Sequence, residues 1–205
     1  MKKTALLSFA IIMIITFAAC SKKTQVGNGA RDYIVPAFVV AWHGPEYVAD
    51  DVVAMLEESN EDGSHLVAIK KNDDGSVTLT MTQEQVDVME KESLDVFYYR
   101  AADMAASSGC EMTINDERTA FVYKIRTGLS FSQRAFPLSM VQVACMYNQI
   151  FSGRTSDELA LDYEIYNIEN GELVIAGTLP QDSLDNAFFD GESLGLAQSY
   201  IIKGS

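Results

Sequence analysis

The chain has 205 residues, of which 48% are hydrophobic and 21% charged, the composition of an ordinary globular protein. Its formal net charge is −14, from 29 acidic and 15 basic residues. Affinity for nucleic acid comes largely from cations placed on phosphates, so this composition argues against a nucleic-acid partner. Anionic lipid headgroups would repel such a chain for the same reason.

The first nineteen residues have the pattern of a secretory signal peptide. Lys2 and Lys3 give a positive start, and Ala5 to Ala19 is apolar apart from two hydroxyl residues. This run is shorter than the ~20 apolar residues that span a bilayer. We therefore predict that residues 1–19 are an export signal rather than a permanent helical anchor.

The end of this run, Phe17-Ala18-Ala19-Cys20, resembles a bacterial lipobox and departs from it at Phe17, where leucine is commonest. In that family the cysteine thiol receives a diacylglyceryl group, the preceding peptide is cleaved and the new amino terminus is acylated. The resemblance implies that Cys20 is the lipid-attachment site and that lipid holds the protein on the extracytoplasmic face of the cell membrane. Each buried methylene stabilises such binding by about 0.8 kcal/mol. The alternative is a plain signal peptide whose cleavage leaves a cysteine nearby.

The part of the chain after the signal is more acidic still, with 13 basic and 29 acidic residues. Residues 20–32 are predicted to be a flexible tether, because Ser21–Arg31 contains two lysines, two glycines and few apolar residues. A flexible chain of that length spans roughly 15–20 Å. Residues 33–205 are expected to form a single globular domain.

The first predicted element of this domain lies at Tyr33–Trp42, which is rich in β-branched and aromatic residues. Pro36 cannot donate to a ladder, so the segment is an edge strand, or a strand that begins after the proline. A helix from Ala37 is the alternative. A helix over about Pro45–Ser59 follows, because its apolar residues recur at helical spacing.

Three β-hairpins are predicted where strand-like runs flank clusters of turn-forming residues. Their strands are, in chain order, His65–Lys71 with Ser76–Met81, Glu111–Ile114 with Thr119–Thr127, and Leu159–Tyr166 with Glu172–Gly177. The third hairpin turns at Asn170-Gly171, the strongest short hairpin signal. The tail, residues 180–205, has only a weak pattern.

Two further helices are predicted between these hairpins. Thr82 and Gln85 fit a capping box ahead of a helix over about Gln83–Ser107. Leu138–Phe151, with Pro137 near its start, is apolar almost all round, as a buried helix is. The sequence thus predicts an α+β fold, a largely antiparallel sheet built from hairpins with two or three helices packed on one face.

Several passages of the mature chain are similar to uncharacterised lipoproteins of gut-associated Gram-positive bacteria. Asp73–Gln85 resembles their "DGSVTLTMTKEQ" run, Asn115–Phe121 their "NDxxTxF" strand and Met146–Phe151 their "MYxxF" helix end, and Asp162–Asn167 matches a strand of their final hairpin. The resemblance covers roughly residues 66–178 and implies a shared fold and location. Those proteins have no established activity, so it implies none here.

Catalytic groups are scarce in this sequence. A nucleophile needs a base within reach, and the two histidines, His43 and His65, lie in or beside turns, where a solvated loop histidine is expected. The ligand spacing of a zinc site, a phosphate loop and a dinucleotide fingerprint are absent. We therefore predict no catalytic residue, no metal ligand and no cofactor.

Three acidic loops are the candidates for binding a hard cation such as calcium, which takes several oxygen ligands. They are Asn60–Gly63, Asn72–Gly75 and Asn115–Glu117. Their spacing is not that of an EF-hand loop, and Asn, Asp and Gly are common turn residues. We interpret all three as turns.

Cysteine and tyrosine pairs leave two questions open. Export permits a disulfide between Cys110 and Cys145, whereas the apolar helix around Cys145 favours a buried free thiol. Tyr98 and Tyr99 are neighbours on the long helix beside a core residue, so at least one should be partly exposed. Such a tyrosine belongs either to the edge of the core or to a binding surface.

The expected function is that of a lipid-anchored extracytoplasmic protein that binds a ligand or another envelope component without catalysing a reaction. This rests on the export signal and on the scarcity of catalytic groups. The alternative is a secreted hydrolase with a pair of carboxylates, since such pairs have no sequence signature.

Overall fold

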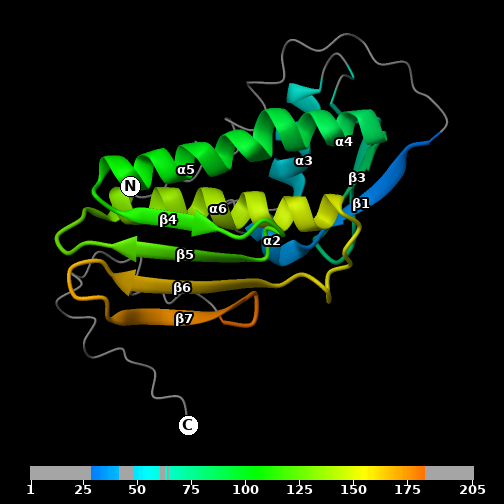
Figure 1. Cartoon of the computed structure of the whole chain (residues 1–205). Helices are drawn as coiled ribbons and strands as arrows, with labels where there is room; N and C mark the ends of the chain where they lie inside the picture. Colours follow the sequence, from blue (N-terminus) through cyan, green and yellow to red (C-terminus); the bar gives the residue numbers. More distant parts are fainter. Residues whose placement is uncertain (1–28, 42–48, 61–62, 64, 183–205) are drawn as a thin grey trace. The chain divides into compact units, whose positions relative to one another are not determined.

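The computed structural model describes residues 29–41, 49–60, 63 and 65–182 (Figure 1). The predicted signal peptide, Cys20, most of the tether and the tail after Asp182 lie outside these ranges. The chain divides into two compact units, residues up to Val96 with Met146–Leu159, and Phe97–Cys145 with the residues from Ala160. Two of the three boundaries fall inside helices, and the single domain expected over residues 33–205 stays a prediction. Within the described ranges, none of the helices has the length and apolarity needed to cross a bilayer.

The fold is α+β, as the sequence predicts. The described strands form an antiparallel sheet in the order β1-β3-β2 and a mixed sheet in the order β4-β5-β6-β7. The strands are Arg31–Val35 (β1), Ala68–Lys71 (β2), Val77–Met81 (β3), Glu111–Ile114 (β4), Ala120–Ile125 (β5), Leu161–Asn167 (β6) and Leu173–Leu179 (β7). The three predicted hairpins are confirmed as β2-β3, β4-β5 and β6-β7, each of them antiparallel.

The first unit begins with a strand that stops at a proline. β1 pairs with β3 along the edge of its sheet and ends just before Pro36, and helix α2 (Ala37–Ala41) follows directly. The Pro36 carbonyl accepts the N–H groups of Val39 and Val40 at 2.9 and 3.0 Å. Both interpretations of residues 33–42, edge strand and helix from Ala37, are therefore partly right.

Helix α3 (Ala49–Ser59) confirms the described part of the helix predicted over residues 45–59. It lies beside β2 in the first unit. The residues before Ala49 lie outside the described part of the chain.

The predicted long helix exists but contains a π-helical turn. Helix α4 (Gln83–Met89), the π-helical segment η1 (Glu90–Leu94) and helix α5 (Asp95–Ser107) follow one another without a break. The apolar stripe steps by five residues from Met89 to Leu94, whereas an α-helix would need a step of three or four. The π turn accommodates the extra residue, and Leu94 is only 1% exposed.

The start and the end of this helical run confirm the sequence signals. Thr82 Oγ1 accepts the N–H of Gln85 at 3.2 Å, and Gln85 Oε1 accepts the N–H of Thr82 at 2.9 Å, so the capping box is present. At the other end Gly109 has φ +70, which a residue with a side chain rarely adopts. The Cys110 N–H then donates to the Ala105 carbonyl at 2.9 Å and closes the helix.

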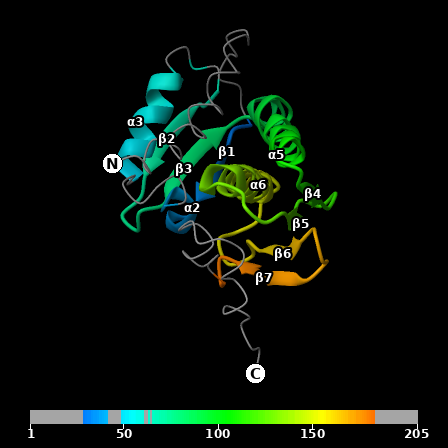
Figure 2. The ribbon, with the colours of Figure 1, turned by 90° about the vertical axis from the view of Figure 1, so that its left-hand side faces the viewer.

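In the second unit β5 and β6 pair in parallel, unlike the hairpin strands. A parallel pair needs a crossover connection, and helix α6 (Phe131–Phe151) is part of the segment that links these strands. Figure 2 shows α6 along one face of the four-stranded sheet. The inward residues of the two central strands are buried, namely Phe121, Tyr123, Ile125, Leu161, Tyr163 and Ile165.

Helix α6 is longer than predicted and contains Pro137 in its interior. It is capped by Ser130 and Gln133: the Gln133 N–H donates to Ser130 Oγ at 3.4 Å, and the Ser130 N–H donates to Gln133 Oε1 at 2.9 Å. The prediction that the apolar residues from Leu138 to Phe151 are buried is confirmed. They are Leu138, Met140, Val141, Val143, Ala144, Cys145, Met146, Tyr147, Ile150 and Phe151.

Candidate functional site

The loops that the sequence offered as cation sites are held by internal hydrogen bonds. Asn60 Oδ1 accepts the N–H groups of His65 and Leu66, both at 2.9 Å. Asn115 Oδ1 accepts two N–H groups in the same manner, at 2.8 and 2.9 Å. Asn72 donates to two hydroxyls at 2.9 Å. These side chains bracket turns, as predicted, and no three His, Cys, Asp or Glu residues of the described part of the chain group around a possible metal site.

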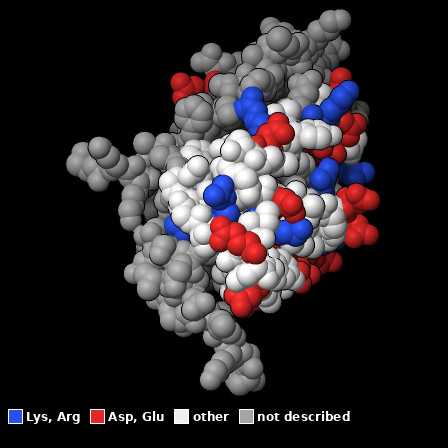
Figure 3. Space-filling model, turned by 60° about the vertical axis from the view of Figure 1, so that its left-hand side comes forward, with Lys and Arg blue, Asp and Glu red and all other residues white. Residues whose placement is uncertain are grey.

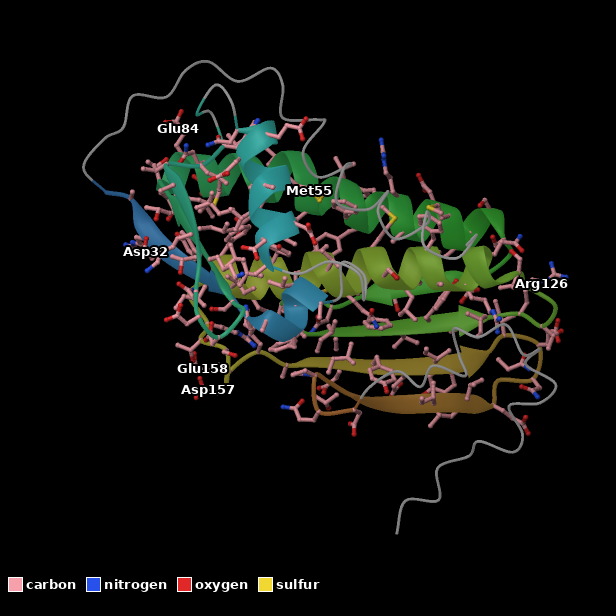
Figure 4. All side chains as sticks on the ribbon, turned by 180° about the vertical axis from the view of Figure 1, so that it is seen from behind. Asp32, Met55, Glu84, Arg126, Asp157 and Glu158 are labelled. Atoms are coloured by element: carbon pink, nitrogen blue, oxygen red, sulfur yellow. The ribbon has the colours of Figure 1, made fainter. Side chains whose placement is uncertain are left out.

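Carboxylates in the Asn72–Gly75 loop and in the turn at residues 155–158 are held in their ionised form. Asp74 Oδ1 accepts the hydroxyl of Ser76 at 2.7 Å and its N–H at 2.9 Å, which lowers the pKa of Asp74. Asp157 and Glu158 come from one turn (Figure 4) and both accept hydrogen bonds from Thr155, which lower the pKa of each. Hydrogen bonds to the charged form keep a carboxylate ionised. These three residues are therefore suited to capping turns and not to acting as a general acid.

Both cysteines beyond Cys20 are free and buried. Burial raises the pKa of the Cys145 thiol to about 12, although a hydrogen bond with Tyr98 and the charge of Arg118 act in the opposite direction. A thiol held protonated is a poor nucleophile and a poor metal ligand. Of the two alternatives for these residues, the structure has the buried free thiol.

The tyrosine pair on the long helix divides as expected. Tyr98 is buried, whereas Tyr99 is 73% exposed. Arg118 places its guanidinium 4.0 Å from the centre of the Tyr98 ring, in cation–π geometry. Arg118 also has φ +58, a left-handed conformation that is uncommon for a residue with a side chain. The turn between β4 and β5 thus places a cation over the buried ring.

A buried polar cluster lies inside the second unit and is not indicated by the sequence. Arg134, on α6, is only 3% exposed, and burial lowers the pKa of its guanidinium. Burial and the neighbouring Cys110 raise the pKa of Tyr123. Outside this cluster, Arg126 lies close to Gly109, and a Cβ added at Gly109 would come within 3.3 Å of Arg126 Nη1. With Tyr123 held protonated, the cluster is suited to hydrogen bonding rather than to proton abstraction.

Glu90 is a carboxyl with a raised pKa. Burial raises it, and the negative charges of Asp87 and Asp95 add to the effect. The residue lies in the π-helical segment η1, and π turns are frequent at functional sites. A raised carboxyl pKa is one of the properties required of a general acid.

The edges of the two sheets differ in how well they are protected. Natural edge strands commonly carry charged residues that prevent pairing with another chain. β1 carries Arg31 and Asp32, β2 carries Lys70 and Lys71, and β4 carries Glu111. β7, the other edge strand, has no charged residue and is the longest of the four, with seven residues. β7 is therefore the edge best suited to pair with an additional strand.

The backbone at the end of β7 shows which way its edge faces. The Thr178 N–H donates to Asp182 Oδ2 at 2.9 Å, and the Asp182 N–H donates to the Thr178 carbonyl at 2.8 Å. Both groups of Thr178 therefore point away from β6. Alternate residues of an antiparallel strand point the same way, so the backbone groups of Ala176 also face outward. The side chain of Ala176 is exposed, and that of Leu173 is 50% exposed.

The β6-β7 hairpin that carries this edge is acidic throughout. Its acidic residues are all exposed, namely Asp162, Glu164, Glu169, Glu172 and Asp182. From residue 160 to residue 182 the sequence contains no Lys, Arg or His. In Figure 3 the lowest part of the described surface, where β6 and β7 lie in Figure 1, shows red acidic residues and no blue basic residues. We call the outer edge of β7 with these carboxylates the acidic edge.

No protein-family model, no curated protein and no solved structure matches the chain. Cys20, the predicted lipid-attachment site, and His43 lie outside the described residues, and His65 is half-buried in the loop that Asn60 holds. One hydrolase motif is not among the sequence predictions. Gly191-Glu192-Ser193-Leu194-Gly195 has the spacing of a nucleophile elbow and also lies outside the described residues.

Proposed function

We propose that the protein is lipid-anchored at the extracytoplasmic face of the cell membrane, where it binds another envelope component without catalysing a reaction. The observation that carries this is Phe17-Ala18-Ala19-Cys20 at the end of an export signal. The similarity of residues 66–178 to lipoproteins of gut-associated Gram-positive bacteria supports the same location. The acidic edge supplies a surface on which a partner can bind.

The number of residues between Cys20 and the first strand is compatible with this arrangement. β1 begins at Arg31, eleven residues after Cys20. A flexible chain of that length spans roughly 15–20 Å. The net negative charge would keep the folded part away from anionic headgroups, so the lipid, and not the protein surface, holds the molecule at the membrane.

The anchor is tested by metabolic labelling with a palmitate analogue, combined with fractionation of membranes. The wild-type chain is expected to carry label and to sediment with membranes, and Cys20→Ala is expected to lose both properties. Cys145→Ala is the matched control, because its thiol is buried in the fold. Equal labelling of wild type and Cys20→Ala would remove the anchor from the proposal.

The second candidate is a secreted hydrolase, and two observations favour it. Glu90 has a raised pKa beside Asp87 and Asp95, as one member of a catalytic carboxylate pair would. Ser193 lies at the centre of the Gly-x-Ser-x-Gly spacing. The test is whether the purified full chain has a hydrolytic activity. Loss of that activity in Glu90→Gln or in Ser193→Ala, with the activity kept in Glu84→Gln, would favour this candidate over the binding proposal.

A further inference from the structure

We propose that the acidic edge binds an extended, basic peptide segment, which adds to β7 as a fifth strand of the sheet β4-β5-β6-β7. This deepens the proposed binding function and rests on it. It names the surface, the mode of binding and the chemistry of the partner.

The mode of binding follows from the backbone of β7. The outward N–H and C=O groups of Ala176 are the kind of edge that an extended peptide recognises through main-chain hydrogen bonds. Asp182 already occupies the corresponding groups of Thr178. The edge offered to a partner is therefore centred on Ala176. It is bounded on one side by the irregular register between Ile175 and Leu173, and on the other by Asp182, whose side chain lies close to Gly177.

The charge of the partner follows from the side chains around this edge. Glu172 precedes β7, Asp182 follows it, and Asp162 and Glu164 lie on the neighbouring strand. Each of these carboxylates is exposed. A segment with Lys or Arg beside a short apolar core complements this surface, and an acidic segment is repelled by it. A second copy of the chain, paired through the same edge, would place these carboxylates next to the same carboxylates of the first copy, and the like charges would repel.

The side-chain register shows how a basic residue can be recognised. Ala176 pairs with Glu164 across β6 and β7. Neighbouring strands lie about 4.8 Å apart, so an added strand stands about 10 Å from β6. The small side chain of Ala176 leaves room for a Lys or Arg of the peptide to reach over it towards Glu164. Glu164 is therefore expected to contribute to the preference for basic peptides.

The test uses three synthetic peptides with the full chain in a nonionic detergent, and binding is measured by fluorescence anisotropy. The first, KKVTVTVKK, has basic ends and a strand-forming core. The second, EEVTVTVEE, reverses the charge, and the third, KKVTPTVKK, keeps the charge but interrupts the strand. Only the first is expected to bind well, and added salt is expected to weaken its binding. Equal binding of the third peptide would mean charge attraction alone and would overturn strand addition.

Variants of the chain locate the site. Ala176→Pro removes an outward N–H without touching the ladder to β6, and we expect affinity for the basic peptide to fall by about tenfold. Ala176→Lys, which keeps the N–H, should weaken binding through its charge. Glu164→Gln with Glu172→Gln should lower affinity by about fivefold and reduce its salt dependence. Glu111→Gln, on the opposite edge of the sheet, is the matched control and should bind as wild type does.

The other possible occupants give different results. One comparison uses a chain that ends at Asp182. If this chain binds the peptide and the full chain does not, residues 183–205 occupy the edge and the proposal is overturned. If the chain self-associates in the absence of peptide and Ala176→Pro abolishes this self-association, a second copy of the chain occupies the edge and the proposal is overturned. Cys20→Ala is expected to bind the peptide normally, so loss of the anchor and loss of peptide binding are distinguishable.

Discussion

The Tyr123 hydroxyl donates a hydrogen bond to the backbone carbonyl of Gln133 at 3.3 Å. In a regular helix the N–H of the residue four positions later would donate to this carbonyl. That residue is Pro137, which has no N–H. Tyr123 is fully buried. A side chain of β5 thus satisfies the group that a proline leaves open in α6, and the helix continues through the proline.

Replacing this donor tests the arrangement. Tyr123→Phe removes the hydrogen bond to the Gln133 carbonyl, and we expect the free energy of unfolding of the full chain to fall by about 0.5–1.5 kcal/mol. In a Pro137→Ala background the restored N–H of residue 137 should donate to the Gln133 carbonyl. Tyr123→Phe should then lower the free energy of unfolding by less. Urea denaturation of the four chains gives the coupling. The exposed Tyr99→Phe is the control, and additive effects at Tyr123 and Pro137 would contradict the argument.

The capping box of α4 provides a second test. Thr82→Ala removes the acceptor of the Gln85 N–H, and the loss of a helix cap typically costs about 0.5–2 kcal/mol. Thr82→Ser keeps a hydroxyl at the same position and should retain most of the stability. The denaturation midpoints of the full chain are compared. An unchanged midpoint in Thr82→Ala would show that the cap contributes little to the fold.

The parts of the fold that the sequence predicts correctly depend on local signals. The hairpin at Asn170-Gly171 is marked by its turn residues, and the start of α4 by the Thr82–Gln85 box. The π turn could also have been predicted, because the stripe steps by five residues between Met89 and Leu94. In each case the residues that decide the structure are close together in the sequence.

The features that were not predicted depend on residues far apart in the sequence. Arg134 and Pro137 interrupt the apolar pattern of α6, and the hydrogen bond from Tyr123 of β5 helps to explain why the helix continues through Pro137. The parallel pairing of β5 with β6 leaves β7 at the edge of its sheet. Hairpin signals give no information on that pairing, so the acidic edge could not be found from the sequence.

The raised pKa of Glu90 makes stability depend on pH in a definite direction. As pH rises above about 4.5, the usual pKa of glutamate, the unfolded chain loses this proton first, and the folded state becomes less stable until its own, higher pKa is passed. Glu90→Gln removes this penalty. We therefore expect the variant to be more stable than wild type at pH 7 and equal to it near pH 3, as measured by urea denaturation.

Glu84→Gln is the control for this prediction. Glu84 is an exposed acidic residue in the first turn of α4, where its charge favours the helix. Its replacement should not raise stability at pH 7. A Glu90→Gln chain that is less stable than wild type at neutral pH would show that the carboxylate has a stabilising partner and would contradict the expected direction.

Burial of the Cys145 thiol can be measured directly. Because the pKa of this thiol is raised to about 12, almost none of it is thiolate at pH 8, and the side chain is fully buried. In the Cys110→Ala chain, where lipidation would occupy Cys20, we expect iodoacetamide to leave Cys145 unmodified until denaturant is added. Mass spectrometry of the peptide containing Cys145 gives the extent of reaction. Rapid modification of the folded chain would show that this part of α6 opens readily.

The final prediction concerns Val141, which is fully buried on α6. Val141→Asp places a carboxylate in an apolar interior, where it must remain neutral or open the fold, at a cost of several kcal/mol. Domains commonly have only about 5–15 kcal/mol of stability, so we expect collapse of the cooperative thermal transition. Gln142→Asp, on a half-buried neighbour, should leave the transition in place. An intact Val141→Asp monomer with less light scattering would instead make this face of α6 a surface for association.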